Sequence, residues 1–221
     1  MRASVFFAGL LLASSALAST TSSCPGGSLS SYLASNFSCQ SGSLVFTDFD
    51  YRGTGQASGS VGVTPFTASD EEGFQFAGGW SVQSQNGIAN SQDSQIGYTV
   101  EHPGGLIDSL SLSFASVVTG TGVASVTEQF CLGAAVANCP KVNEGSVAVT
   151  NPGVGFIDKA FFAGVENVGV SEAINVTSGV NGTARIGNVT DTFSSPEPLS
   201  FVLLGTGLLG FGLMRRRLDR R

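Results

Sequence analysis

The sequence predicts an all-β fold, a single β-sandwich domain of jelly-roll type, on three observations. Apolar residues alternate with polar ones at a period of two, as at Leu110, Leu112 and Phe114, or at Val147 and Val149. Such runs recur at short intervals between stretches of Gly, Asn, Ser and Pro, which is the spacing of a sandwich. No stretch of the central region keeps a helical apolar stripe for twelve residues, so a helix-rich fold is excluded.

Nine segments are expected to form strands, with a short helix at 28–36 and a turn at 119–122. The strand segments are 45–48, 60–66, 73–80, 95–101, 109–114, 122–131, 147–149, 167–176 and 184–193. Within 73–80, Phe74 and Phe76 are in phase with Trp80, so one face of that strand is apolar. This phase favours burial of Trp80 over the alternative, a sugar-stacking platform of Trp80, Tyr98 and Tyr51.

Composition and charge exclude several classes of protein. The 221 residues are 42% hydrophobic and only 12% charged, and 61 of them are glycine or serine, which argues against a coiled coil. Between residues 19 and 195 there are four cations and fourteen acids, a net charge of −10. A surface this acidic is unsuited to binding phosphate backbones, so we expect no nucleic-acid partner.

The first eighteen residues have the three parts of a secretory signal peptide. Arg2 supplies the positive charge, residues 5–12 form a short apolar stretch, and Ala16 and Ala18 make an A-x-A cleavage site before Ser19. The apolar stretch is too short to cross a bilayer about 30 Å thick. We therefore expect residues 1–18 to be removed at export by a signal peptidase after passage through the Sec translocon.

The carboxyl end consists of a short motif, an apolar run and a basic cluster. Pro196, Glu197 and Pro198 precede residues 199–214, which are almost without polarity. Sixteen helical residues span about 24 Å, which is short for a permanent anchor. Five arginines close the chain, and the positive-inside rule places them in the cytoplasm: Arg215, Arg216, Arg217, Arg220 and Arg221.

This order of three parts resembles the PEP-CTERM sorting signal of bacterial exosortase substrates. The resemblance implies that an exosortase, a membrane-embedded transpeptidase, reads residues 196–221, removes the transmembrane helix and passes the body to the cell surface or exopolysaccharide matrix. Ser195 precedes the motif where many members carry valine. The alternative is a plain single-pass membrane anchor that keeps its tail.

The central region, 19–195, more loosely resembles exported members of the same group. The segments that carry this likeness are 47–51, 126–133 and 167–171. Since no activity is established for that group, the resemblance supports a β-rich exported domain and transfers no catalytic residue.

All four cysteines lie in the region expected to be exported, which predicts two disulfides. Four cysteines permit three connectivities, and the spacing favours the local pairs Cys24 with Cys39 and Cys131 with Cys139. A zinc site is disfavoured because the chain has no Cys-x-x-Cys pair and a single histidine.

Few residues suggest a catalytic or metal-binding site. His102 begins an expected turn, and no Gly-x-Ser-x-Gly elbow accompanies it. A hydrolase is therefore disfavoured, and we expect that the protein is not an enzyme. Asp48 and Asp50 are expected on one side of a strand, and Asp70, Glu71 and Glu72 in a compact acidic turn. Carboxylates suit calcium, but these match no calcium-loop template, and solvated surface acids are the favoured interpretation.

Together these observations predict an exported surface or matrix protein with a structural or adhesive role and no required cofactor. The alternatives are a calcium-dependent or carbohydrate-binding module, which would contact matrix polysaccharide, and a degenerate extracellular hydrolase.

Overall fold

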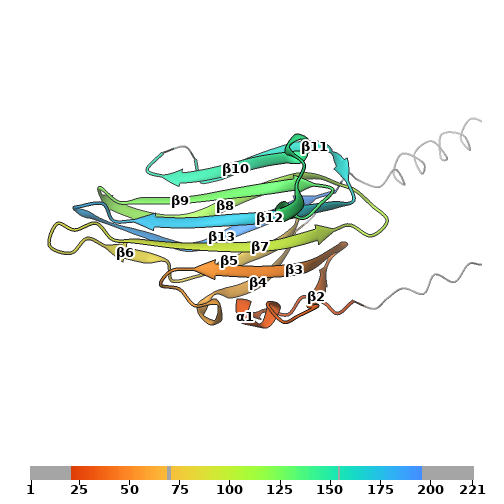
Figure 1. Ribbon diagram of the computed structural model, residues 1–221, viewed down its shortest axis with the longest axis horizontal. Coiled ribbons are helices and arrows are strands. Elements are labelled where there is room, and N and C mark those ends of the chain that lie inside the picture. Colours follow the sequence, from red (N-terminus) through yellow and green to blue (C-terminus); the bar gives the residue numbers. More distant parts are fainter. Residues whose placement is uncertain (1–20, 69–70, 154, 196–221) are drawn as a thin grey trace, which may run out of the picture.

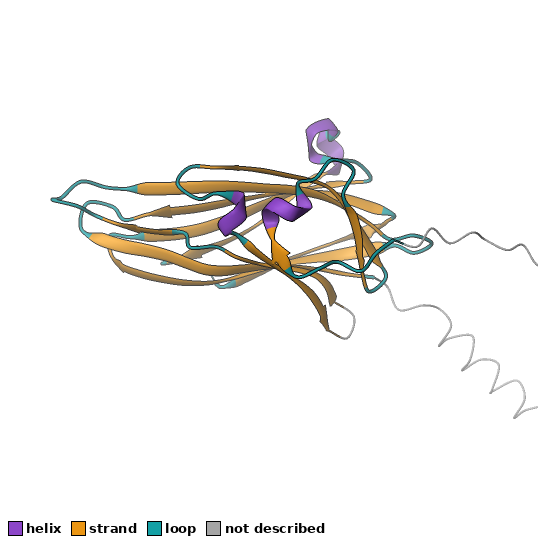
Figure 2. Ribbon diagram, turned by 90° about the horizontal axis from the view of Figure 1, so that it is seen from below, coloured by secondary structure: helices purple, strands orange, loops and turns teal. Residues whose placement is uncertain are grey.

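The structure is a computed structural model that describes residues 21–68, 71–153 and 155–195. Two antiparallel sheets lie one over the other, and their strands run along the long axis of the body (Figure 1). This confirms the all-β sandwich predicted from the period-two alternation. The short helical segments lie on the outside of the strands (Figure 2).

The first sheet has six strands in the order β10-β9-β12-β7-β3-β2. Their bounds are β2 (Ser38–Ser41), β3 (Leu44–Gly53), β7 (Ser91–Glu101), β9 (Val123–Leu132), β10 (Glu144–Asn151) and β12 (Asn167–Thr177).

The second sheet has seven strands, six of them in the order β1-β4-β5-β13-β8-β11, while β6 pairs with β13. Their bounds are β1 (Gly27–Ser28), β4 (Gly62–Ala68), β5 (Glu71–Ala77), β6 (Ser81–Gln83), β8 (Ile107–Gly120), β11 (Ile157–Val165) and β13 (Gly182–Ser194). The chain changes sheet at most of its turns, so each sheet is built from segments distant in sequence.

The four helical segments are all short. They are α1 (Leu29–Tyr32), η1 (Ser58–Ser60), η2 (Val136–Asn138) and η3 (Lys141–Asn143). The helix expected at 28–36 is therefore present but is one turn long, with Leu29 and Tyr32 buried.

One core fills the space between the sheets. It is formed by the inward members of the alternating strands, including Leu110, Leu112 and Phe114 of β8. Burial of these apolar side chains is the main stabilising term of such a fold. Tyr98 lies among the rings of Phe46, Phe49, Phe74, Phe76 and Phe193.

Four strands of the structure were not predicted, the short β1, β2 and β6 and the edge strand β11, and one predicted strand ends early. The strand expected at 73–80 ends at Ala77, and Trp80 lies in the connection to β6. A Cβ on Gly78 would come within 2.6 Å of the Trp80 ring, so the lack of a side chain there lets the indole pack against the chain. The edge strand β11 was not predicted, because it carries apolar side chains on both faces, with Phe161 exposed next to half-buried Phe162.

The signal peptide at 1–18 and the sorting segment at 196–221 lie outside the described residues. Within the part of the chain that the structure describes, no helix has the length and apolar character needed to cross a membrane.

Candidate functional site

Three carboxylic acids lie in the interior between the two sheets. Glu128 of β9 and Glu172 of β12 come from the first sheet, and Asp191 of β13 comes from the second; all three are fully buried. We call these three residues, with Tyr98 of β7, the carboxyl cluster. Carboxylates are almost never fully buried unless they are paired, so the cluster is the most unusual chemical feature of the described chain.

The strand period explains why these acids point inward. Glu128 lies between Val126 and Phe130, which are both buried, and so takes the inward phase of β9. The same holds for Glu172 between Val170 and Ile174, and for Asp191 between Val189 and Phe193. The cluster was not predicted from the sequence, although the alternation that identified these strands contained the signal.

The register brings the acids together. Glu172 is the direct partner of Glu128 on neighbouring strands, so the two side chains are adjacent on the inner face of the first sheet. Asp191 reaches them from the facing sheet. Its Oδ2 accepts a hydrogen bond of 3.0 Å from the Tyr98 hydroxyl, and this bond joins the two sheets through the core.

The other five carboxyl oxygens of the cluster receive no hydrogen bond from an N–H or hydroxyl group of the described chain. These are both oxygens of Glu128, both of Glu172, and Oδ1 of Asp191. The one ion pair within the described residues joins Lys159 to Glu71, so no cation is paired with the cluster there. Among the described residues, the donors left for these oxygens are the carboxyls of the cluster themselves, once protonated.

Burial favours the neutral form of each acid. It raises the pKa of Glu128 and of Glu172 well above the usual range, and the negative charge of Asp191 adds to both shifts. Burial also raises the pKa of Asp191, to about 6, although its interactions with Glu172, Tyr98 and Glu128 oppose the shift. The pKa of Tyr98 is raised as well, first by burial and then by Asp191.

The metal-ligand candidates from the sequence lie elsewhere and do not form one group. Among residues 21–68, 71–153 and 155–195, no group of three or more His, Cys, Asp or Glu side chains could hold a metal ion. Asp70 lies outside the described residues. Calcium binding therefore stays a prediction, without a site among the described residues.

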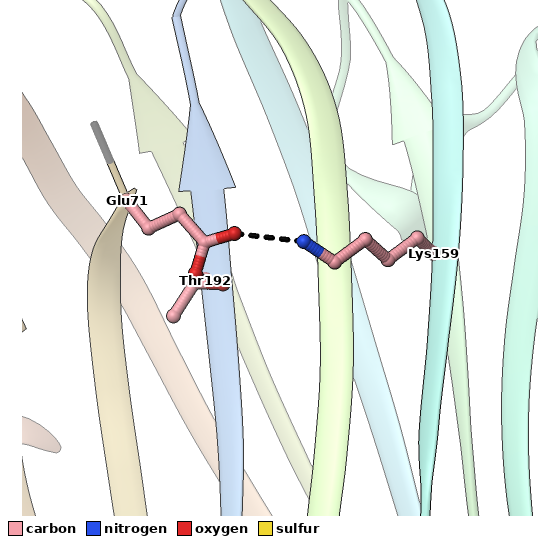
Figure 3. Close-up of polar contacts among 3 residues, drawn as sticks. All are labelled: Glu71, Lys159 and Thr192. Atoms are coloured by element: carbon pink, nitrogen blue, oxygen red, sulfur yellow. Dashed lines mark hydrogen bonds and ion pairs between the residues drawn. The ribbon is translucent and has the colours of Figure 1, made fainter. Parts of the chain in front are cut away.

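The compact acidic turn expected at 70–72 is wrong for its two described members. Glu71 and Glu72 are the first residues of β5, where neighbouring side chains point to opposite faces. Glu71 Oε1 lies 2.8 Å from Lys159 Nζ, and its other oxygen accepts a hydrogen bond from the Thr192 hydroxyl. Figure 3 shows the contact between Glu71 and Lys159.

Glu72 has a separate structural role at the turn between β2 and β3. Its Oε2 accepts hydrogen bonds from the backbone N–H groups of Ser43, at 2.8 Å, and Leu44, at 3.1 Å. It thereby connects the turn of the first sheet to β5 of the second.

Asp48 and Asp50 do share one side of β3, as expected. Asp48 has a positive φ of 56° at a β-bulge, where the pairing with β7 shifts between Thr47 and Asp50. Both side chains are exposed and line one pocket of about 290 Å³ on the outer face of the first sheet. We call this the outer-face pocket.

The outer-face pocket has polar and apolar lining in about equal parts. Arg52, Gln95 and Ser171 line it beside the two aspartates, and Gln95 Nε2 donates to Ser171 Oγ at 2.7 Å. The segment 135–137 borders it from the disulfide-closed loop. Gly97 of β7 leaves room for the Asp50 side chain, because a Cβ there would come within 1.8 Å of Asp50 Oδ1.

The aromatic platform considered for sugar binding does not exist. Trp80 is fully buried and its indole N–H donates to Ser94 Oγ at 3.0 Å. Tyr98 is buried in the carboxyl cluster, and the half-buried Tyr51 donates its hydroxyl proton to Gln56 O at 2.7 Å. The interpretation that Trp80 belongs to the core is confirmed.

His102 lies in the turn after β7, as predicted. Its backbone N–H donates to Glu166 O at 2.8 Å, and its ring lies where a side chain on Gly105 would otherwise sit. The absence of enzymatic activity stays a prediction.

Both local disulfides are confirmed. Cys24 is bonded to Cys39 and Cys131 to Cys139, and no cysteine is free. The first bond attaches the segment before α1 to β2, and the second closes the loop that borders the outer-face pocket.

No protein-family model and no curated protein sequence matches the chain. Among solved structures, the chain is similar to TmCBM61 in complex with β-1,4-galactotriose, with 14% identity and a TM-score of 0.33. That match covers 65% of this chain and 86% of TmCBM61. A likeness at this level carries no argument about ligand or activity.

Proposed function

We propose that this chain is an exported protein of the cell surface or exopolysaccharide matrix, and that its β-sandwich has a structural or adhesive role. The observation that carries the proposal is the pairing of all four cysteines in two disulfides. Disulfides form and persist in exported compartments and are rare in the cytoplasm. The sandwich itself is held by one closed core, which suits a passive load-bearing part.

The proposal includes the two ends of the chain. Residues 1–18 act as the signal peptide, and residues 196–221 act as the sorting segment read by an exosortase at Pro196, Glu197 and Pro198. The three-part order of the tail supports this step. In the competing model, the arginine cluster stays in the cytoplasm and the chain remains a single-pass membrane protein.

Processing is tested on the protein isolated from the surface of the producing cells. We expect the intact mass and terminal sequencing to place Ser19 at the amino terminus and to show loss of residues 199–221. A Glu197→Ala variant is expected to keep the tail, since the proposed recognition motif is disrupted. Retention of Arg215–Arg221 in the mature wild-type protein would support plain anchoring and refute the sorting step.

A second candidate function is binding of a hydroxyl-rich ligand such as matrix polysaccharide, and the outer-face pocket favours it. Asp48, Asp50, Arg52 and Gln95 give this pocket both hydrogen-bond donors and acceptors. Small-ligand sites need a few placed polar groups of this kind. The pocket replaces Trp80 as the place where such binding should be sought.

Binding is tested with purified matrix polysaccharide, with and without calcium. If the outer-face pocket binds, we expect the double variant Asp50→Ala/Gln95→Ala to lower affinity about tenfold or more, since a lost hydrogen bond to a charged group contributes about 1.5–3 kcal/mol. The control is Asp93→Ala, which removes an acid outside this pocket. Equal binding by wild type and double variant would exclude the pocket, and a loss on calcium removal would show a cation requirement.

A further inference from the structure

We propose that Glu128, Glu172 and Asp191 share protons in the interior of the sandwich and make its stability depend on pH. The folded state is most stable in acid and becomes less stable as the pH rises. This property goes beyond the proposed surface role and does not depend on it. The inference rests on the burial, the register and the missing partners of the three acids.

The first step is the count of hydrogen-bond donors. The cluster has six carboxyl oxygens, and the described chain supplies one donor to them, the Tyr98 hydroxyl. An ionised carboxylate only accepts hydrogen bonds, whereas a protonated one also donates. Protons on Glu128 and Glu172 would let both donate to Asp191, so that a single negative charge is held by three donors. That arrangement satisfies oxygens that would otherwise be buried without a partner.

The second step is the surroundings of the cluster. Its side chains are flanked on β9, β12 and β13 by apolar residues, and the rings of Phe49, Phe74 and Phe193 lie around Tyr98. Pairing in the second sheet places Leu112 of β8 and Phe74 of β5 beside Asp191. The titratable groups that face one another are therefore Tyr98, Glu128, Glu172 and Asp191, all acidic. Two or three negative charges buried here would repel one another, and no cation of the described chain is paired with them.

The third step is the direction of the pH effect. In the unfolded chain these acids have pKa values of about 4, and in the folded chain burial raises the pKa of each, that of Asp191 to about 6. The folded state thus binds more protons than the unfolded state above about pH 4. Stability from the cluster is fully present below about pH 4 and is lost as the pH rises through 6 and beyond. Salt-bridged surface acids give the opposite dependence.

The experiment is urea unfolding of the purified full chain from pH 4 to pH 8.5, followed by the fluorescence of Trp80. We expect the folding equilibrium constant of the wild type to fall with rising pH, by up to tenfold per pH unit for each proton released. In the Glu128→Gln/Glu172→Gln variant the amides keep the shape and the donors but do not titrate, so we expect a clearly flatter profile. Glu166→Gln, which removes an exposed acid of the same type, should keep the wild-type slope and so controls for general charge repulsion.

Two further measurements keep the proposal testable if the double variant does not fold. The infrared spectrum of the wild type should retain the C=O stretch of a protonated carboxylic acid at pH 7, and Asp191→Asn should shift that band. A wild-type profile that is flat or rises with pH, or a spectrum without this band, would overturn the proposal. The proposal would also be overturned if calcium raised and EDTA lowered the urea-unfolding midpoint of the wild type but not that of the double variant. Such a result would mean that a bound cation neutralises the acids.

Discussion

Replacement of Trp80 by alanine is expected to lower the free energy of unfolding by about 3–5 kcal/mol, the usual cost of removing a large buried aromatic side chain. The indole is fully buried, and its N–H bonds to Ser94 Oγ, which also contacts the Tyr51 hydroxyl at 3.0 Å. The variant therefore creates a cavity and removes one of the bonds of Ser94. Urea unfolding followed by far-ultraviolet circular dichroism measures the change, since Trp80 is the only tryptophan.

The matched control is Phe161→Ala, an aromatic truncation at a position that is 80% exposed. Its effect should stay within about 0.5 kcal/mol. A Trp80→Ala variant as stable as this control would contradict the placement of the indole in the core. The comparison also bears on function, because a loss of ligand binding in Trp80→Ala would report unfolding, not the loss of a sugar contact.

Removal of the disulfides is expected to have the second largest effect. With sequence separations of 15 and 8 residues, loop-closure entropy predicts about 3 kcal/mol for Cys24–Cys39 and about 2.5 kcal/mol for Cys131–Cys139. The paired alanine variants, compared with the oxidised wild type by urea unfolding, measure each value separately.

Reduction of the wild type with dithiothreitol is the control for these variants, because it opens both bonds without a change of side-chain volume. The reduced protein should lose about as much stability as the two double variants together. If reduction leaves the unfolding midpoint unchanged, the cysteines do not cross-link the folded protein, and the support for export is lost.

Most of the strands could be predicted because their burial is one-sided. At β8, the alternation of Leu110, Leu112 and Phe114 with serines reports directly which face meets the core. Where that condition fails, prediction fails too: β11 is an edge strand with apolar side chains on both faces, and no period of two identifies it. The end of β5 was also missed, because the phase of Trp80 continues that of Phe76 although Gly78 and Gly79 turn the chain away.

Some candidate site residues were predicted from local patterns, whereas others depend on contacts between distant segments. Asp48 and Asp50 were expected on one side of β3 and do line one pocket. Plain alternation would put them on the side of buried Phe46, so their exposure depends on the β-bulge, which no local pattern revealed. Glu71 and Glu72 were misplaced, since nothing in the residues 70–72 reveals that Lys159, eighty-eight residues away, pairs with the first of them. Disulfide pairing was inferred from short separations and confirmed, although spacing alone leaves three connectivities open.

The sequence by itself determined the fold class, the acidity of the central region and which side chains face inward, because these follow from periods and counts along the chain. The same periods put Glu128, Glu172 and Asp191 in the inward phase of their strands, a signal that went unused in the prediction. Only the tertiary structure decided that these three acids meet, because they lie on strands of two sheets, up to sixty-three residues apart, whose order and register no local pattern encodes. Three acids in separate strands are ordinary, whereas the same acids gathered in one closed interior have to share protons.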